Sequence, residues 1–212
     1  MVIMENSNQR EKRKAVNNSL EKLDFEIPSW KKIHRSILEL SVEIEKSNFK
    51  PDIIVGMARG GWIPARIISD CLGNPNLANV SVEFYENLGE TKRKPMIKQP
   101  ISISVRNKKI LLVDDVVDTG KSVKLVETHL RNNGASSIKI ASVYYKPWSI
   151  AIPEYYQKET QLWIIFPWEI KESVKKILEK FQGQNRTRKD IKNRLIQLGL
   201  DSNILESFIK ED

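Results

Sequence analysis

The sequence predicts an α/β domain built on a parallel sheet with helices on its faces. Short apolar runs rich in β-branched residues alternate along the chain with segments whose apolar residues recur three and four positions apart. This alternation is typical of right-handed βαβ units. A chain of 212 residues accommodates one such domain with additional segments. In sheets of this kind, the functional site lies beyond the carboxyl ends of the strands.

The composition is that of an ordinary globular protein. Hydrophobic residues make up 40% and charged residues 29%, with 9 Gly and 9 Pro, which disfavours wholesale disorder and collagen-like repeats. The single cysteine, Cys71, cannot form an internal disulfide. No apolar run approaches the ~18 residues of a membrane span, and the first residues lack the apolar core of a secretory signal. We therefore expect a cytoplasmic protein that is neither exported nor inserted in a membrane.

The elements of the first half are predicted from capping residues and hydrophobic spacing. Residues 29–47 have apolar positions three and four apart behind a serine N-cap, so we expect a helix there. Residues 52–57 form a short β-branched run, typical of a strand buried on both faces. The glycines at 60 and 61 end this strand, and a helix follows until Gly73. Residues 80–85 repeat the strand pattern.

The second half continues the same alternation. Helices are predicted where valines and leucines recur at helical spacing before a terminating glycine, and strands where apolar residues follow one another without a break. The expected elements are strands at 101–105 and 109–115, a helix at 119–133, strands at 138–146 and 163–166, and a helix at 169–181.

Positive charge gathers in one part of the chain. Lys and Arg total 35 against 27 acidic residues, a formal net charge of +8. From Leu88 to Ile110 there are seven basic residues and only one acidic residue, Glu90. Such local excess indicates a small polyanionic partner and not a surface coated for nucleic acid. The alternative is a basic loop that is merely solvated.

Residues 110–123, Ile-Leu-Leu-Val-Asp-Asp-Val-Val-Asp-Thr-Gly-Lys-Ser-Val, carry the clearest chemical signal. The apolar run predicts a strand that ends in two adjacent carboxylates, Asp114 and Asp115, and a turn opens a helix at Thr119–Ser122. A helix N-terminus with hydroxyl residues and a glycine suits a phosphate dianion, because free N–H groups and the positive dipole end meet there. Carboxylates accept hydrogen bonds from vicinal hydroxyls. Together these groups predict a site for a ribose 5-phosphate.

Two other interpretations apply to the same segment. Gly-Lys-Ser at 120–122 matches the end of a nucleotide triphosphatase loop, but that loop requires a glycine five positions before Gly120, where this chain has Asp115. The carboxylate would repel the phosphates, which argues against such a loop. The plainer alternative is that the acids cap the following helix, with Asp118 as its N-cap.

The segment resembles the phosphoribosyl pyrophosphate (PRPP) motif of the type I phosphoribosyltransferases: a hydrophobic strand, two acids, two apolar residues, then Asp-Thr-Gly with a following hydroxyl residue. The resemblance spans about residues 29–178 and implies the Rossmann-like parallel sheet of that family with a small hood. It implies that Asp114 and Asp115 bind the ribose hydroxyls, and that Asp118 accepts a proton near N7 of a purine. The residues implied for the 5-phosphate are Asp118, Thr119, Gly120, Lys121 and Ser122.

The turn at residues 57–61, Met-Ala-Arg-Gly-Gly, resembles the pyrophosphate loop of the same family. The resemblance implies a cis peptide between Ala58 and Arg59, although such a bond costs ~3–4 kcal/mol. Gly60 permits close backbone approach, and the Arg59 guanidinium can neutralise pyrophosphate. The stretch 85–96 resembles the mobile loop that closes over the active site, and its basic residues are Lys92, Arg93 and Lys94.

The last third of the chain resembles the base-binding hood of archaeal-type purine phosphoribosyltransferases. The resemblance implies that Lys146 donates a hydrogen bond to O6 of the base, that Trp163 stacks on the base and that Ile164 offers backbone atoms to its edge. Trp168 is expected to pack in the core. The residues implied for Mg²⁺ are Asp114 and Asp115, with Glu169 acting through water.

The resemblance implies transfer of the phosphoribosyl group from PRPP to N9 of a purine base, giving a purine nucleoside monophosphate and pyrophosphate. A lysine donor suits an oxygen at C6, which favours hypoxanthine or guanine and leaves adenine as an alternative. We expect a homodimer with no nucleic acid or membrane partner. The competing hypothesis is a transcriptional regulator that senses PRPP or a nucleotide on the same fold without catalysis.

Beyond a polar tail at 1–24 and a catalytic domain at 25–180, residues 181–212 are predicted as a linker and a helical hairpin. Its apolar residues flank a stop at Gly199, and Asp201 is the expected N-cap of the second helix. The hairpin is too small to fold alone, so we expect it to pack on a neighbour as a dimer contact or regulatory element. From Phe181 onward, six basic and five acidic residues leave a net charge of +1, which is poor for a DNA-binding motif.

Overall fold

The computed structural model describes residues 25–85, 94–181 and 187–209. The chain divides into two compact units. One, which we call the sheet unit, comprises residues 31–161. The other, the terminal unit, combines residues 1–30 with residues 162–212. The predicted tail at 1–24 and the basic residues Lys92 and Arg93 lie outside the described residues.

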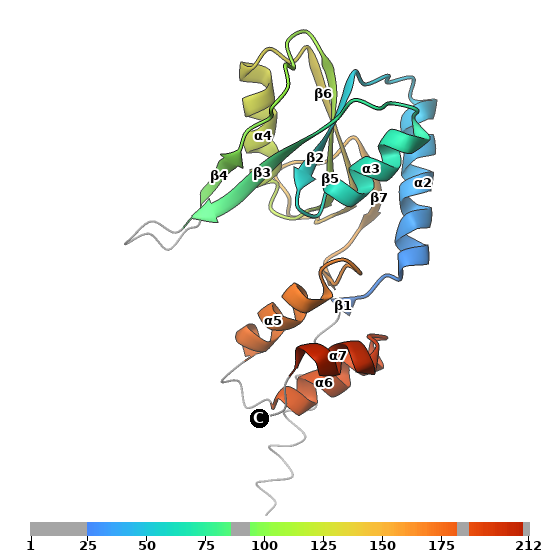
Figure 1. The fold of residues 1–212 in the computed structure, drawn as a ribbon, viewed down its shortest axis with the longest axis vertical. Coiled ribbons are helices and arrows are strands. Elements are labelled where there is room, and N and C mark those ends of the chain that lie inside the picture. The colour runs from blue at the N-terminus through green and yellow to red at the C-terminus, as the bar shows by residue number, and fades with distance from the viewer. Residues whose placement is uncertain (1–24, 86–93, 182–186, 210–212) are drawn as a thin grey trace, which may run out of the picture. The chain divides into compact units, whose positions relative to one another are not determined.

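Six strands of the sheet unit form one sheet in the order β4-β3-β2-β5-β6-β7 (Figure 1). Neighbouring strands run parallel, except that β3 and β4 are antiparallel. The predicted α/β class with a parallel sheet is therefore confirmed, with one antiparallel strand at an edge. The strands are β2 (Ile53–Ala58), β3 (Leu77–Tyr85), β4 (Lys94–Gln99), β5 (Lys109–Val117), β6 (Ser137–Tyr145) and β7 (Tyr155–Glu159).

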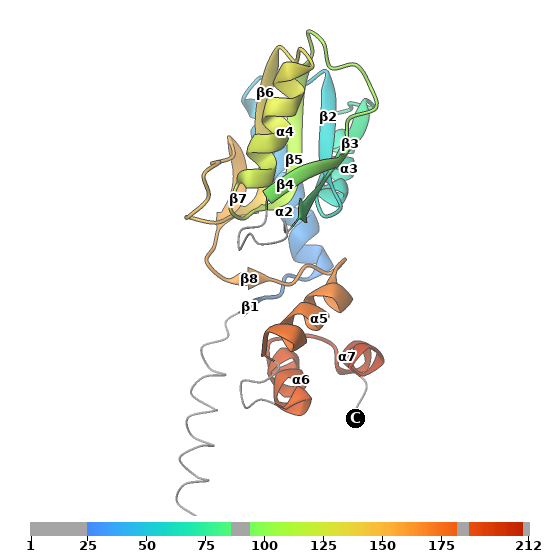
Figure 2. The ribbon, with the colours of Figure 1, turned by 90° about the vertical axis from the view of Figure 1, so that its left-hand side faces the viewer.

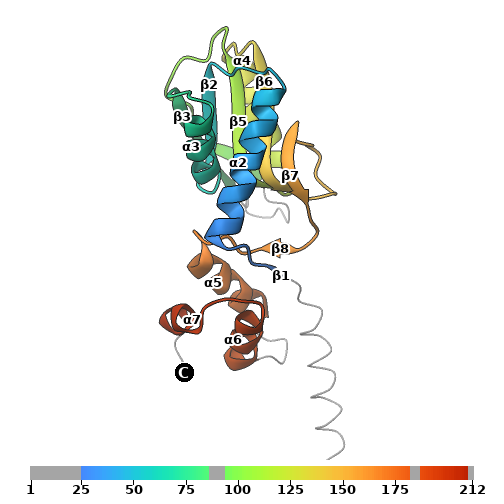
Figure 3. The same cartoon turned by 90° about the vertical axis from the view of Figure 1, so that its right-hand side faces the viewer.

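Helices cover both faces of this sheet. Helix α4 (Lys121–Asn132) lies on one face, and α2 (Trp30–Lys46) and α3 (Trp62–Cys71) lie on the other (Figures 2 and 3). Alternate side chains of the central strands point to opposite faces, so both faces bury apolar residues. The core on the α4 face includes Val55, Val80, Ile110, Leu112, Val123, Val126 and Leu130.

One predicted strand was wrong. Residues 101–105 are not a strand. The strand in this part of the chain is β4, which lies earlier in the sequence and pairs with β3. The β-branched composition of 101–105 imitates a strand, but its buried residue Val105 packs in the core from a turn, where its carbonyl accepts from Lys108 N–H at 3.0 Å. β4 is mostly polar and exposed, and its structure comes from pairing with β3, with Tyr85 opposite Lys94. Such pairing leaves no strong hydrophobic pattern in the sequence of an edge strand.

The strand β5 is longer than predicted. It does not end at Asp114 and Asp115 but continues to Val117, because Val116 and Val117 pair with Tyr144 and Tyr145 of β6. The two carboxylates therefore lie within a strand, where successive side chains point in opposite directions. Helix α4 begins at Lys121, and Gly120 before it adopts φ 75°, a left-handed conformation that favours glycine.

The terminal unit has a small core of its own. A two-stranded parallel sheet pairs β1 (Phe25–Glu26) with β8 (Trp163–Ile164), so the expected strand at 163–166 is shorter. Neither β1 nor β7 was predicted, because each has few residues and takes its structure from a partner strand. The helices are α5 (Ile170–Phe181), α6 (Arg188–Gln197) and α7 (Ser202–Phe208).

The C-terminal hairpin packs on α5. Val174 and Ile177 of α5 share a buried cluster with Ile191 and Leu195 of α6 and Leu205 of α7. The hairpin thus has a packing partner within the terminal unit, and its role as a dimer contact or regulatory element stays a prediction. The Asp201 side chain caps α7, as predicted, by accepting from the N–H groups of Asn203 and Ile204 at 2.8 and 3.1 Å. None of the helices in the described ranges is long and apolar enough to span a membrane.

Candidate active site

Three neighbouring strands deliver the predicted site segments to one edge of the sheet. β2, β5 and β6 lie side by side and parallel, so their carboxyl ends meet. The turn with Arg59 follows β2, the loop that begins at Asp118 follows β5, and Lys146 follows β6. The Lys146 backbone N–H donates to the Val117 carbonyl at 2.9 Å, which ties two of these ends together.

A pocket opens at the carboxyl end of β5. Its volume is about 440 Å³. It combines the end of a strand with the first turn of α4, where the helix dipole is positive and the backbone N–H groups are not yet used inside the helix. The pocket is lined by Phe84, Asp114, Val116, Val117, Asp118, Thr119, Gly120, Lys121, Ser122 and Val123. Every residue predicted for the 5-phosphate is in this lining.

The paired acids face different surroundings. Asp114 lines the pocket, whereas Asp115 is 7% exposed and lies beside the turn at 58–61. Each accepts a hydrogen bond from the next backbone N–H: Asp115 N to Asp114 Oδ1 at 3.0 Å, and Val116 N to Asp115 Oδ1 at 2.9 Å. Burial and, after it, the neighbouring charge of Asp115 raise the pKa of Asp114 well above its usual value. Hydrogen-bond donors or a cation in the pocket would favour the ionised form.

The turn after β2 lies against Asp115. The peptide between Ala58 and Arg59 is cis, as predicted. A Cβ atom added at Gly60 would lie 1.9 Å from Asp115 Oδ2, and one added at Gly61 would lie 2.5 Å from the Val113 carbonyl oxygen. A side chain at Gly60 would have to displace the Asp115 carboxylate, and one at Gly61 would meet backbone atoms of β5. This close approach brings the expected pyrophosphate loop beside one of the two acids.

The chain after Lys146 reaches back to Asp118. The Trp148 indole Nε1–H donates to Asp118 Oδ1 at 2.9 Å. Nζ of Lys146 lies 5.6 Å from the centre of the same indole ring, within range of a cation–π interaction. Lys146 is 6% exposed, whereas Trp148 is 53% exposed. Sequence reasoning named Asp118 and Lys146 but missed Trp148 and the pocket residue Phe84. An aromatic residue two positions after Lys146 was the available signal.

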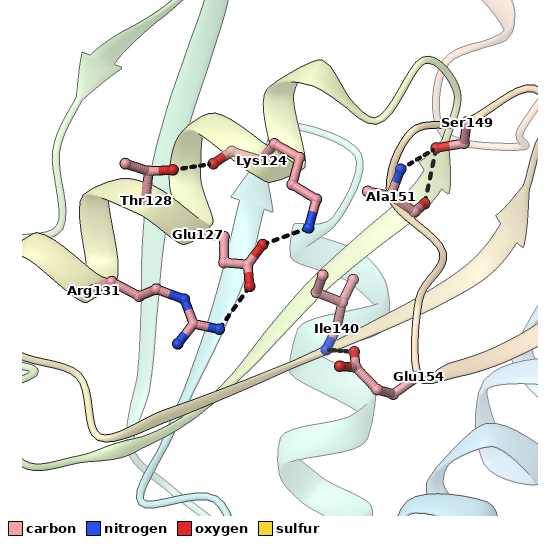
Figure 4. A network of polar contacts seen from close by, with 8 residues as sticks. All are labelled: Lys124, Glu127, Thr128, Arg131, Ile140, Ser149, Ala151 and Glu154. Atoms are coloured by element: carbon pink, nitrogen blue, oxygen red, sulfur yellow. Dashed lines mark hydrogen bonds and ion pairs between the residues drawn. The ribbon is translucent and has the colours of Figure 1, made fainter.

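Polar contacts hold the chain that follows Trp148 (Figure 4). The Ser149 hydroxyl donates to the Ala151 carbonyl at 2.8 Å and accepts from the Ala151 N–H at 3.2 Å. Glu154 accepts from the Ile140 N–H at 2.7 Å. A Cβ atom at Gly120 would lie 2.6 Å from both Ala151 N and Ser149 Oγ, so this segment lies directly against the phosphate loop.

The remaining predicted residues belong to the terminal unit. Trp163 is half-buried, and Nζ of Lys180 lies 5.3 Å from the centre of its ring. Ile164 pairs with Glu26 across the two-stranded sheet. Glu169 precedes α5, and its carbonyl accepts from the Ser173 N–H at 2.9 Å. Trp168, expected in the core, is half-buried and stacks on Phe166 with ring centres 4.7 Å apart.

The donor set of the acids suits a hard cation. Within residues 25–85, 94–181 and 187–209, no group of three or more His, Cys, Asp or Glu side chains could hold a metal ion by itself. Mg²⁺ typically takes one or two protein carboxylates and completes its shell with water and substrate phosphates. Asp114 and Asp115 fit that pattern. They would hold the ion only together with a phosphorylated ligand.

The chain belongs to the phosphoribosyltransferase family: the model of the phosphoribosyl transferase domain matches residues 26–174. A xanthine-guanine phosphoribosyltransferase from Cereibacter sphaeroides is 33% identical over 150 residues, which cover 67% of this chain and 85% of that protein.

Solved structures show the same likeness. A purine phosphoribosyltransferase from Pyrococcus horikoshii is 40% identical, with a TM-score of 0.63 over 68% of this chain and 93% of that one. A Neisseria gonorrhoeae protein with bound ppGpp is 25% identical, with a TM-score of 0.62 over 69% of this chain and 89% of that one.

Proposed function

We propose that this chain is a purine phosphoribosyltransferase. It transfers the 5-phosphoribosyl group of PRPP to N9 of a purine base and yields a purine nucleoside 5′-monophosphate and pyrophosphate. The observation that carries the proposal is that the phosphate pocket, the turn with Arg59 and Lys146 lie at the carboxyl ends of three adjacent strands. The names of the relatives in Cereibacter and Pyrococcus support a purine as the acceptor.

The reaction assigns a role to each segment. The bond between C1 of the ribose and the pyrophosphate oxygen breaks, and both electrons leave with pyrophosphate, beside Arg59 and the backbone of the turn at 58–61. The sugar then carries positive charge, which nearby carboxylates stabilise. The purine N9 lone pair forms the new bond to C1, and the proton on N7 passes to Asp118. The N–H groups at the start of α4 hold the 5-phosphate throughout.

Mg²⁺ is the proposed cofactor. Asp114 and Asp115 would hold it together with PRPP, and the role of Glu169 through water stays a prediction from the resemblance to the family. When bound, the ion neutralises charge on the leaving pyrophosphate.

We propose a 6-oxopurine as the base. Lys146 is a pure hydrogen-bond donor, so its ammonium suits an oxygen at C6 and would face the amino group of adenine as donor against donor. The roles of Trp163 and Ile164 at the base stay predictions from the resemblance to the family. Nothing in the site favours the alternative of a regulator without catalysis. A homodimer in the cytoplasm and the domain boundaries at 24 and 180 stay predictions.

The test is the rate of pyrophosphate release with PRPP, Mg²⁺ and each of hypoxanthine, guanine, xanthine and adenine. We expect transfer to the 6-oxopurines with kcat/KM above that for adenine. The variant Asp118→Asn should lower kcat by ~10²- to 10⁴-fold, the usual contribution of a positioned general base, with PRPP affinity unchanged. The control Asp70→Asn changes a carboxylate on the exposed side of α3. Turnover of Asp118→Asn within about threefold of the parent would refute the base role.

A further inference from the structure

The contact between Trp148 and Asp118 has no role in the function proposed so far. Asp118 follows β5 and Trp148 follows β6, so the contact joins the phosphate loop to the segment that carries Lys146. The indole N–H points at a carboxylate oxygen from 2.9 Å, a good distance for a charge-assisted hydrogen bond. Large aromatic side chains are usually buried, yet Trp148 is 53% exposed. Its indole N–H is held by this hydrogen bond although about half of the side chain is exposed.

We infer that Trp148 is a positioning residue for the transfer reaction, an inference that rests on the proposed function. The indole N–H takes Oδ1 of Asp118 and so fixes the orientation of the carboxylate. The second oxygen, Oδ2, is then the one that receives the purine proton. A carboxylate held by one fixed donor loses less orientational freedom when the base binds. The hydrogen bond should therefore raise kcat for the transfer step.

The indole ring also contacts Lys146, the residue proposed to donate a hydrogen bond to O6 of the base. Nζ of Lys146 lies 5.6 Å from its centre, so the negative face of the ring attracts the ammonium. One side chain thus contacts both the proton acceptor and the donor for O6. Mutation can separate the two contacts of Trp148. The variant Trp148→Phe keeps an aromatic ring beside Lys146 but loses the N–H that donates to Asp118.

The backbone of this segment has anchors that do not involve the Trp148 side chain. The Ile150 N–H donates to the Thr119 carbonyl at 3.2 Å, and the Ser149 N–H donates to the Lys146 carbonyl at 2.9 Å. Gly120 packs closely against Ser149 and Ala151. Trp148→Phe should therefore fold normally and keep the segment in place.

The test is a double-mutant cycle with Trp148→Phe and Asp118→Asn, assayed with PRPP and hypoxanthine. We expect Trp148→Phe to lower kcat about tenfold, the effect of losing one hydrogen bond to a charged group, with KM for PRPP unchanged. In the Asp118→Asn background the same change should have no further effect, because Trp148 acts through Asp118. Trp148→Ala should also lower the preference for hypoxanthine over adenine. The control Ile152→Ala removes a side chain in the same segment that is 68% exposed.

A spectroscopic measurement tests the contact without turnover. The indole ¹H–¹⁵N resonance of Trp148, assigned by its loss in Trp148→Phe, should move in Asp118→Asn and stay in place in Asp70→Asn. Two results with an active parent protein would overturn the inference and leave the proposed function intact. One is that the effects of Trp148→Phe and Asp118→Asn on kcat are additive, and the other is that the indole resonance does not move in Asp118→Asn. A parent protein without transfer to any purine would overturn the proposed function and the inference together.

Discussion

Replacing Gly60 with alanine tests the closest contact in the site. The added Cβ would lie 1.9 Å from Asp115 Oδ2 and 2.4 Å from its Cγ, whereas ordinary contact begins near 3.4 Å. The carboxylate must therefore retreat by about 1.5 Å, the difference between 3.4 and 1.9 Å. Asp115 is 7% exposed and its Oδ1 accepts from Val116 N–H, so it has little room to move. We expect a loss of ~1–3 kcal/mol in the free energy of unfolding, as in other overpacked interiors.

The same displacement should impair PRPP binding and transfer. A misplacement of ~1 Å at a reacting site can cost about 10²-fold, and we expect a fall of that order in kcat/KM for PRPP. Urea unfolding and calorimetric titration of PRPP with Mg²⁺ measure the two effects. The control is Gly73→Ala. Its new Cβ has open space around it, so its only cost is the positive φ of +58° at this position. Because the clash is with Asp115, Gly60→Ala should cost far less stability in an Asp115→Ala background. Equal stability losses in both backgrounds, or normal PRPP binding by Gly60→Ala, would refute the reasoning.

Three further predictions concern single groups. Arg59→Ala should weaken product inhibition by pyrophosphate, and an unchanged inhibition constant would count against a role of Arg59 at the leaving group. Burial raises the pKa of Glu127, but hydrogen bonds from Arg131 and Lys124 outweigh it and lower the pKa below its usual value. That stabilisation is present above the unfolded pKa of about 4.3 and is lost as the pH falls through the lower folded value. The Tm of Glu127→Gln should thus fall less than that of the parent between neutral and acidic pH, and parallel curves would contradict this. Asp201→Ala should cost ~1 kcal/mol by removing the cap of α7, measured by urea unfolding against the exposed control Asn203→Ala.

The local chemistry of the site was predictable from the sequence. The apolar run before Asp114, the glycine at 120 and the hydroxyl residues beside it are neighbours in the chain, and their geometry depends on bonds within a few residues. The same holds for the Asp201 cap of α7. The cis peptide between Ala58 and Arg59 was inferred instead from the resemblance to the family. Hydrophobic spacing likewise predicted the buried strands and the helices, because burial on one or two faces imposes a period on the sequence.

Only the tertiary structure decided which segments meet. β4 is polar and became a strand because β3 lies beside it, while the more apolar 101–105 did not. β5 runs past the two acids because β6 offers partners to Val116 and Val117, and this separates the surroundings of Asp114 and Asp115. The hydrogen bond from Trp148 to Asp118 joins residues 30 positions apart. Backbone pairing and such contacts depend on the geometry of the partner, which leaves no periodic signal in the sequence of either segment.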